Sequence, residues 1–178
     1  MVPGRSVPGG RRDRAMTPAN LVTLAAYNKW ANRRLYEACG RLSDEDYRAL
    51  RPAFFGSIHA TLNHILVGDR VWLGRLEGQP SGIQALDQIL YDDFATLHAA
   101  RTAEDERIDR VVAALDPPAL DRPFTYRTMA GETKSFPLGS VLMHIFNHQT
   151  HHRGQIHGLL SATAVPPPSL DLILFLDG

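Results

Sequence analysis

The chain has 178 residues, carries 19 Lys and Arg against 19 Asp and Glu, and contains a single cysteine, Cys39. Balanced charge without a long basic run argues against a nucleic-acid surface, and one cysteine can form neither an internal disulfide nor a cysteine-rich zinc motif. No apolar run reaches the ~20 residues of a membrane span, and no secretory signal is recognisable. We therefore expect a cytoplasmic protein that binds neither nucleic acid nor membrane.

The first residues differ in composition from the rest of the chain. They contain four arginines, three glycines and two prolines, with almost nothing that a core could bury. This composition predicts a disordered leader over residues 1–16. The remainder, residues 17–178, has a length and apolar content that suit one folded domain.

The predicted domain opens on a helix that is signalled at both ends. Thr17 is a typical N-cap and Pro18 suits the first helical position, while a glycine directly follows Cys39 as a stop. The inward stripe of this helix includes Asn28 and Asn32 among apolar residues. Because a buried amide needs hydrogen-bond partners, we expect both side chains to bond to neighbouring helices.

A second helix is predicted from Ile58 to about Glu77, with Ser57 as its N-cap. His64 lies in the middle of this helix beside an apolar patch, and the small residue Gly68 leaves room for another group to approach. Asp69 falls within the main apolar stripe, where an unpaired carboxylate would be costly. We therefore expect Asp69 to pair with an arginine.

Shorter elements surround a third helix. Residues 41–56 are predicted to be a loop, and the third helix is expected from about Ala85 to Leu115, where two prolines stop it. Alternation within residues 121–137 predicts an irregular hairpin, and Ser169 is expected to cap a final short helix over Leu170–Leu176. The charged face of the third helix is interpreted as a solvated surface, which comprises Arg101, Asp105, Glu106, Arg107, Asp109 and Arg110.

The last long helix, predicted from about Leu138 to Leu160, contains five of the eight histidines. A turn of 100° per residue places His148 and His152 at the centre of its apolar stripe and His144 on the flank. Imidazoles four residues apart lie one above the other, at a spacing that lets two ring nitrogens share one metal ion.

Two interpretations of these histidines follow from the residues alone. They could be core side chains bonded to their neighbours, or they could share a metal ion, which satisfies both ring nitrogens at once and is favoured for His148 and His152. His64 is the preferred third ligand because it lies on a buried helix with small neighbours. His144, displaced from the central seam, is the less favoured alternative.

Four segments follow one another in order along the chain, Tyr27–Leu35, Ser57–Leu66, Asn147–Gln155 and Ser169–Ile173. In these segments the sequence resembles the DinB family. The resemblance implies a four-helix bundle in which three histidines, one from the second helix and two from the fourth, hold a divalent metal. On this chain these positions are His64, His148 and His152. The resemblance also implies a homodimer and a link to the stress response, but no DNA binding.

The expected architecture is therefore all-α, an up-down-down-up four-helix bundle of the DinB-like kind with a short hairpin before the last long helix and a short C-terminal helix. Three imidazoles leave a coordination position open, which is typical of a catalytic site. The resemblance to thiol-dependent enzymes of the wider superfamily implies that the protein transfers a low-molecular-weight thiol to a small molecule. Metal-assisted hydrolysis is the second possibility. A non-catalytic metal-binding or interaction protein is the alternative. Imidazole suits zinc, nickel, iron and manganese alike, and the sequence identifies no general acid or base.

Overall fold

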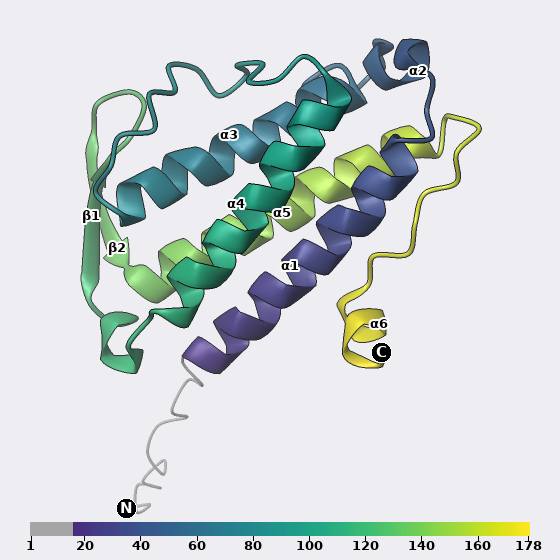
Figure 1. The fold of residues 1–178 in the computed structure, drawn as a ribbon. Coiled ribbons are helices and arrows are strands. Elements are labelled where there is room, and N and C mark those ends of the chain that lie inside the picture. The colour runs from purple at the N-terminus through teal and green to yellow at the C-terminus, as the bar shows by residue number, and fades with distance from the viewer. Residues whose placement is uncertain (1–15) are drawn as a thin grey trace, which may run out of the picture.

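The computed structural model describes residues 16–178 and is mostly helical, as the sequence predicted (Figure 1). The predicted leader, residues 1–16, lies outside the described residues except for Met16. The long helices are α1 (Pro18–Cys39), α3 (Ile58–Leu76), α4 (Phe94–Ala113) and α5 (Leu138–Leu160). The short elements are α2 (Asp44–Arg48), the 3-10 turn Pro117–Ala119, β1 (Pro123–Arg127), β2 (Thr133–Pro137) and α6 (Leu172–Leu176).

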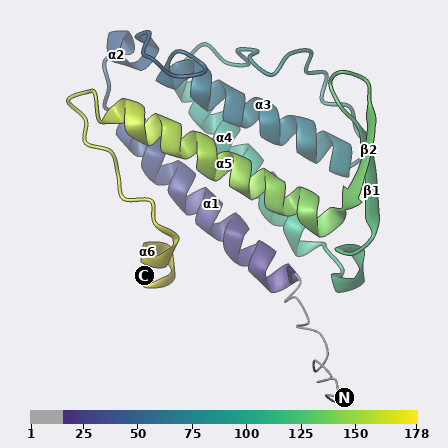
Figure 2. The same cartoon turned by 180° about the vertical axis from the view of Figure 1, so that it is seen from behind.

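The long helices lie side by side, as both views of the ribbon show (Figures 1 and 2). Helices α1 and α3 each pack against both α4 and α5. The hairpin covers the end of the helices where α5 begins, and α2 lies at the opposite end. This arrangement places the middle of α3 directly against the middle of α5, which are the two segments that carry the candidate site.

Helix starts follow the capping residues that the sequence predicted. Thr17 forms a capping box with Asn20, and the Ser57 hydroxyl accepts a hydrogen bond from the Ala60 amide. These side chains satisfy amide groups that have no partner inside the helix. The predicted hairpin is also confirmed, with Phe124 opposite Phe136 across antiparallel strands.

The start of α4 differs from the prediction, because this helix begins at Phe94 and not near Ala85. Its N-cap is Asp93, whose carboxylate accepts from the amide of Thr96 at 2.8 Å. The preceding segment, 77–93, is irregular and includes Gly82 with a φ of 71°. Of the apolar residues at helical spacing in this segment, Leu90 packs on the core from a loop and Leu86 is exposed, so their periodicity was misleading.

Two further boundaries needed correction. The predicted loop over residues 41–56 contains the short helix α2, which Ser43 caps and which buries Tyr47. The final helix starts at Leu172, two residues later than predicted, and its N-cap is Asp171 and not Ser169. Within the described part of the chain, no helix has both the length and the hydropathy that a membrane crossing requires.

The core consists of two hydrophobic clusters separated by a polar layer. One cluster lies toward α2 and includes Leu35 and Leu66, and the other lies toward the hairpin and includes Leu73 and Ile108. Between them every long helix contributes buried polar side chains at intermediate positions. These are Asn28, Asn32, Asp69, Arg101, Asp105, Gln149 and Arg153.

The polar layer corrects the interpretation of α4 as having a simple solvated face. Arg101 is only 1% exposed and Asp105 only 4%, and the two form an ion pair at 3.0 Å. Arg101 also pairs with Asp69 from α3, which confirms that Asp69 has an arginine partner. Charges on α4 therefore tie this helix to α3 inside the core.

Helix α1 joins the same layer through its two asparagines, as predicted. Asn32 donates to Asp105 at 2.9 Å and to Gln149 at 3.2 Å, so it links α4 to α5. Asn28 donates to Asp105 at 3.2 Å and accepts from Arg153. Because Gln149 and Arg153 also lie on α5, the layer fixes the rotation of the helix that carries two of the three candidate histidines.

Candidate metal centre

Three histidine side chains meet at one point between α3 and α5. The Nε2 atom of His64 lies 3.2 Å from Nε2 of His148 and 3.1 Å from Nε2 of His152. The remaining pair, Nε2 of His148 and Nε2 of His152, is 3.1 Å apart. This triangle brings together the three residues that the sequence singled out, and such a cluster could hold a metal ion.

Hydrogen bonds on the far side of two rings determine where their protons lie. Nδ1 of His64 lies 2.7 Å from the carbonyl oxygen of Leu86, and Nδ1 of His152 lies 2.8 Å from Oε1 of Gln155. Both partners are acceptors, so each Nδ1 carries the proton and each Nε2 presents a lone pair. Gln155 therefore holds a candidate ligand from the next turn of the same helix.

These tautomers make the triangle unfavourable unless a cation lies within reach of it. The lone pairs of His64 and His152 face each other at 3.1 Å with no hydrogen between them. A metal bound to imidazole at about 2.0–2.1 Å, with bond angles between about 90° and 109°, places its ligand nitrogens about 2.8–3.4 Å apart. All three observed separations fall in that range, so the residues fit a divalent metal.

Burial keeps the three imidazoles in the neutral form that binds metals. Burial, together with the neighbouring histidines, lowers the pKa of His148 to about 3. Burial lowers the pKa of His152 to about 4, against the opposing effect of its bond to Gln155. The pKa of His64 is lowered by burial as well. None of the three rings therefore takes up a second proton near neutral pH, and all three stay uncharged.

We expect metal affinity to stay nearly constant from about pH 8 down to about pH 5, because protons compete only near the pKa of the free ligands. Those pKa values, about 3 for His148 and about 4 for His152, lie well below the usual 6.5. Competition against a chelator of known protonation at several pH values measures this. A tenfold loss of affinity on going from about pH 7 to about pH 6 would instead indicate ordinary imidazoles.

Gly68 and Phe55 hold two of the rings in place. The ring of Phe55 stacks on that of His64 with centroids 3.9 Å apart. A Cβ atom added at Gly68 would lie only 2.8 Å from Cε1 of His148 and 3.3 Å from its Nδ1. The space that the sequence predicted beside Gly68 is therefore filled by the ring of His148.

Replacing Gly68 with alanine is expected to push His148 out of the triangle and to weaken metal binding by about 10- to 100-fold, the usual cost of disturbing a ligand's support. Gly154→Ala on α5 is the matched control, because a Cβ there meets nothing within 4 Å. Chelator competition on both variants measures the difference. Equal affinities would show that the position of the His148 ring does not depend on this close approach.

Some supporting residues were missed by sequence reasoning. Oδ1 of Asn63 accepts from the amides of Leu90 and Tyr91 at 2.9 and 3.0 Å, which holds segment 77–93 against α3. Leu86 in that segment provides the carbonyl that orients His64. The sequence feature that could have predicted this support is Asn63, a polar residue next to His64 on a largely apolar helix. His144 lies outside the triangle, with its ring centroid 5.9 Å from that of His148.

The fold and the site define a helical protein with a candidate three-histidine metal centre. A model described as the DinB family matches residues 16–178. The chain therefore belongs to the DinB family, as the sequence motifs predicted. It is also similar to Protein DinB of Bacillus subtilis (strain 168), with 26% identity over 162 residues that cover 86% of this chain and 92% of that protein.

Proposed function

We propose that this DinB protein is an up-down-down-up four-helix bundle that holds one divalent metal through His64, His148 and His152 and uses it to transfer a small-molecule thiol to an electrophile. The observation that carries the proposal is the pair of unprotonated Nε2 atoms on His64 and His152, which face each other at 3.1 Å. Backbone and amide acceptors on their outer nitrogens hold both rings in the tautomer that ligates a metal.

An adjacent cleft gives a small molecule access to the histidines. His64 and His148 line a cavity of about 440 Å³ between α3, α5 and the hairpin. This volume lies within the range of about 300–1,000 Å³ typical of ligand sites. A site built only to stabilise the fold would enclose its metal, so the open side supports a catalytic role.

The composition of the cleft favours a thiol over water as the nucleophile. A divalent metal bound at the histidines would act as a Lewis acid that lowers the pKa of a thiol or of water. A thiol starts near a pKa of about 8.5, far below that of water, and needs no strong base. The described residues that line the cleft include no Asp or Glu, which leaves hydrolysis without a carboxylate base.

The transfer itself requires little further chemistry from the chain. The thiol loses its proton, the sulfur forms a bond to carbon of the electrophile, and a leaving group such as chloride departs with the bonding electrons. Burial lowers the pKa of His144, which makes its imidazole a weak base, so the thiol proton leaves to solvent through the cleft. The walls position the two reactants and limit the access of water.

A screen of low-molecular-weight thiols tests this function. Bacillithiol, mycothiol and glutathione are each offered with a chlorinated acceptor, and wild type is compared with His148→Ala. We expect turnover with at least one thiol and its reduction to background in the variant. Activity that does not depend on His148 would contradict the mechanism. Bound metal without turnover would favour the alternative, a non-catalytic metal-binding protein, and elemental analysis identifies the metal among zinc, nickel, iron and manganese.

A further inference from the structure

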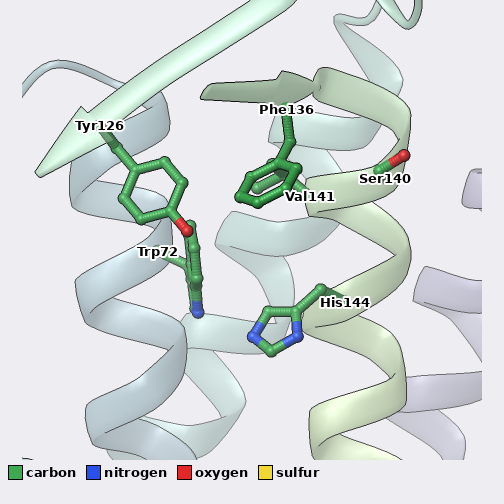
Figure 3. A pocket seen from close by; sticks show the side chains of 6 residues that line it. All are labelled: Trp72, Tyr126, Phe136, Ser140, Val141 and His144. Atoms are coloured by element: carbon green, nitrogen blue, oxygen red, sulfur yellow. The ribbon is translucent and has the colours of Figure 1, made fainter. Parts of the chain in front are cut away.

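The cleft beside the histidines extends into an aromatic pocket under the hairpin. Figure 3 shows Tyr126 and Trp72 on one side of this pocket and Phe136, Val141 and His144 on the other. The pocket measures about 230 Å³ and shares Trp72, Tyr126 and His144 with the larger cavity. A ligand that reaches the histidines therefore has aromatic walls to pack against.

Arg75 lies in this cleft with its charge uncompensated. Its guanidinium carbon is 4.6 Å from the ring centroid of Trp72 and 4.9 Å from that of Tyr126. Within residues 16–178 it makes no ion pair, whereas Arg70, Arg101 and other arginines of the helices pair with carboxylates. Stacking on two rings holds a guanidinium plane in place and leaves its N–H edge available.

The residues around Arg75 also supply no negative charge to this end of the fold. A neighbouring cavity of about 410 Å³ includes both Arg75 and Arg127, and neither it nor the two other cavities at this end of the fold is lined by a described Asp or Glu. Arg127 donates to the carbonyl of Gly131, so its donors are partly used. Burial lowers the pKa of Arg75, the direction expected for a cation without an anionic partner.

We propose that Arg75 binds the carboxylate of the substrate, whose apolar body packs against Trp72 and Tyr126 and whose reacting end lies at His64 and His148. The inference rests on the proposed function for the reacting end and names the substrate class as a carboxylate-bearing thiol. The planar fork of arginine binds a carboxylate through two parallel hydrogen bonds, which gives orientation as well as affinity.

Binding of a matched pair of thiols tests the role of Arg75. The probes are 4-(sulfanylmethyl)benzoate and its neutral amide, titrated by calorimetry into wild type, Arg75→Gln and the control Arg110→Gln, an exposed arginine outside the cleft. We expect the acid to bind wild type and the control about tenfold or more tightly than the amide. Arg75→Gln should lose this preference while its metal content is unchanged.

A second pair of probes separates this inference from the metal proposal. The compounds 4-methylbenzoate and 4-methylbenzamide carry no thiol, and their binding is followed through the indole N–H signals of the chain's two tryptophans. Trp72 should respond to the acid, and Trp30, which packs against Phe175, should not. If the protein proves not to bind metal, this response still reports on Arg75.

Two outcomes would overturn the inference while leaving the metal site intact. One is equal affinity of wild type for acid and amide in both pairs of probes. The other is a preference for the acid that persists in Arg75→Gln, which would place the carboxylate on the metal and not on the arginine.

Discussion

Replacing His148 with alanine is expected to lower metal affinity by more than about 100-fold, because even the outer partners of metal ligands are worth about 10- to 100-fold. Wild-type protein purified without chelator should contain close to one divalent metal per chain, and the variant little or none. Elemental analysis and chelator competition measure the two quantities. The reason is geometric, since Nε2 of His148 completes the triangle at 3.2 Å from Nε2 of His64 and 3.1 Å from Nε2 of His152.

His157→Ala is the control for this experiment, since His157 lies on the same helix and is not part of the cluster. It should retain full metal content, which separates loss of a ligand from a general effect of removing a histidine from α5. Equal loss of metal from both variants would indicate unspecific binding. Full occupancy in His148→Ala would show that this residue is not a ligand.

Replacing Asp69 with asparagine is expected to reduce the free energy of unfolding by about 1.5–3 kcal/mol, the usual worth of hydrogen bonds to a charged group, because Arg101 and Gln149 lose their charged partner while Arg101 keeps its ion pair with Asp105. Asp69 is 1% exposed, pairs with Arg101 and accepts from Nε2 of Gln149 at 3.0 Å. Burial raises the pKa of Asp69 to about 6, with Arg101 opposing the shift, so the carboxylate is charged at neutral pH. Calorimetry should show a melting temperature lower by roughly 10 °C.

Glu132→Gln is the control for that measurement, because Glu132 forms an exposed pair with Lys134 at 2.9 Å. An exposed pair contributes about 1 kcal/mol or less, so the control should melt close to wild type. Asp69→Asn with the stability of wild type would contradict the view that the polar layer joins the helices.

The candidate site could be predicted from sequence because its signal is local. His148 and His152 occur four residues apart on one helix, and the period of the helix alone brings their rings together. The third residue, His64, needed the further assumption that its helix packs against the last one. The close packing near the site could also be predicted, because Gly68 leaves the space that the ring of His148 occupies.

Features that depend on pairing between distant segments were not accessible in this way. Arg101 and Asp105 look like an exposed i,i+4 pair until Asp69 and the two asparagines of α1 close around them. On a helix face rich in charged residues, the sequence does not show which charged side chains are solvated and which are buried. The partners that satisfy these charges lie on other helices, so only the packed structure shows that they are buried.

The prediction of where α4 starts was wrong for a related reason. Apolar residues in segment 77–93 continue the helical period, but their backbone groups have other partners. The amides of Leu90 and Tyr91 bind Asn63, and the carbonyl of Leu86 binds His64. Tertiary hydrogen bonds thus replace the helical ones, and the same replacement builds the support of the metal site.

X-ray absorption spectroscopy at the metal edge, on protein purified without chelator, tests the convergence of the three imidazoles most directly. The geometry predicts three nitrogen neighbours at about 2.0–2.1 Å with the multiple-scattering pattern of imidazole, together with at least one exchangeable neighbour such as a water oxygen. A shell with sulfur, or with one imidazole or none, would contradict a metal held between His64, His148 and His152.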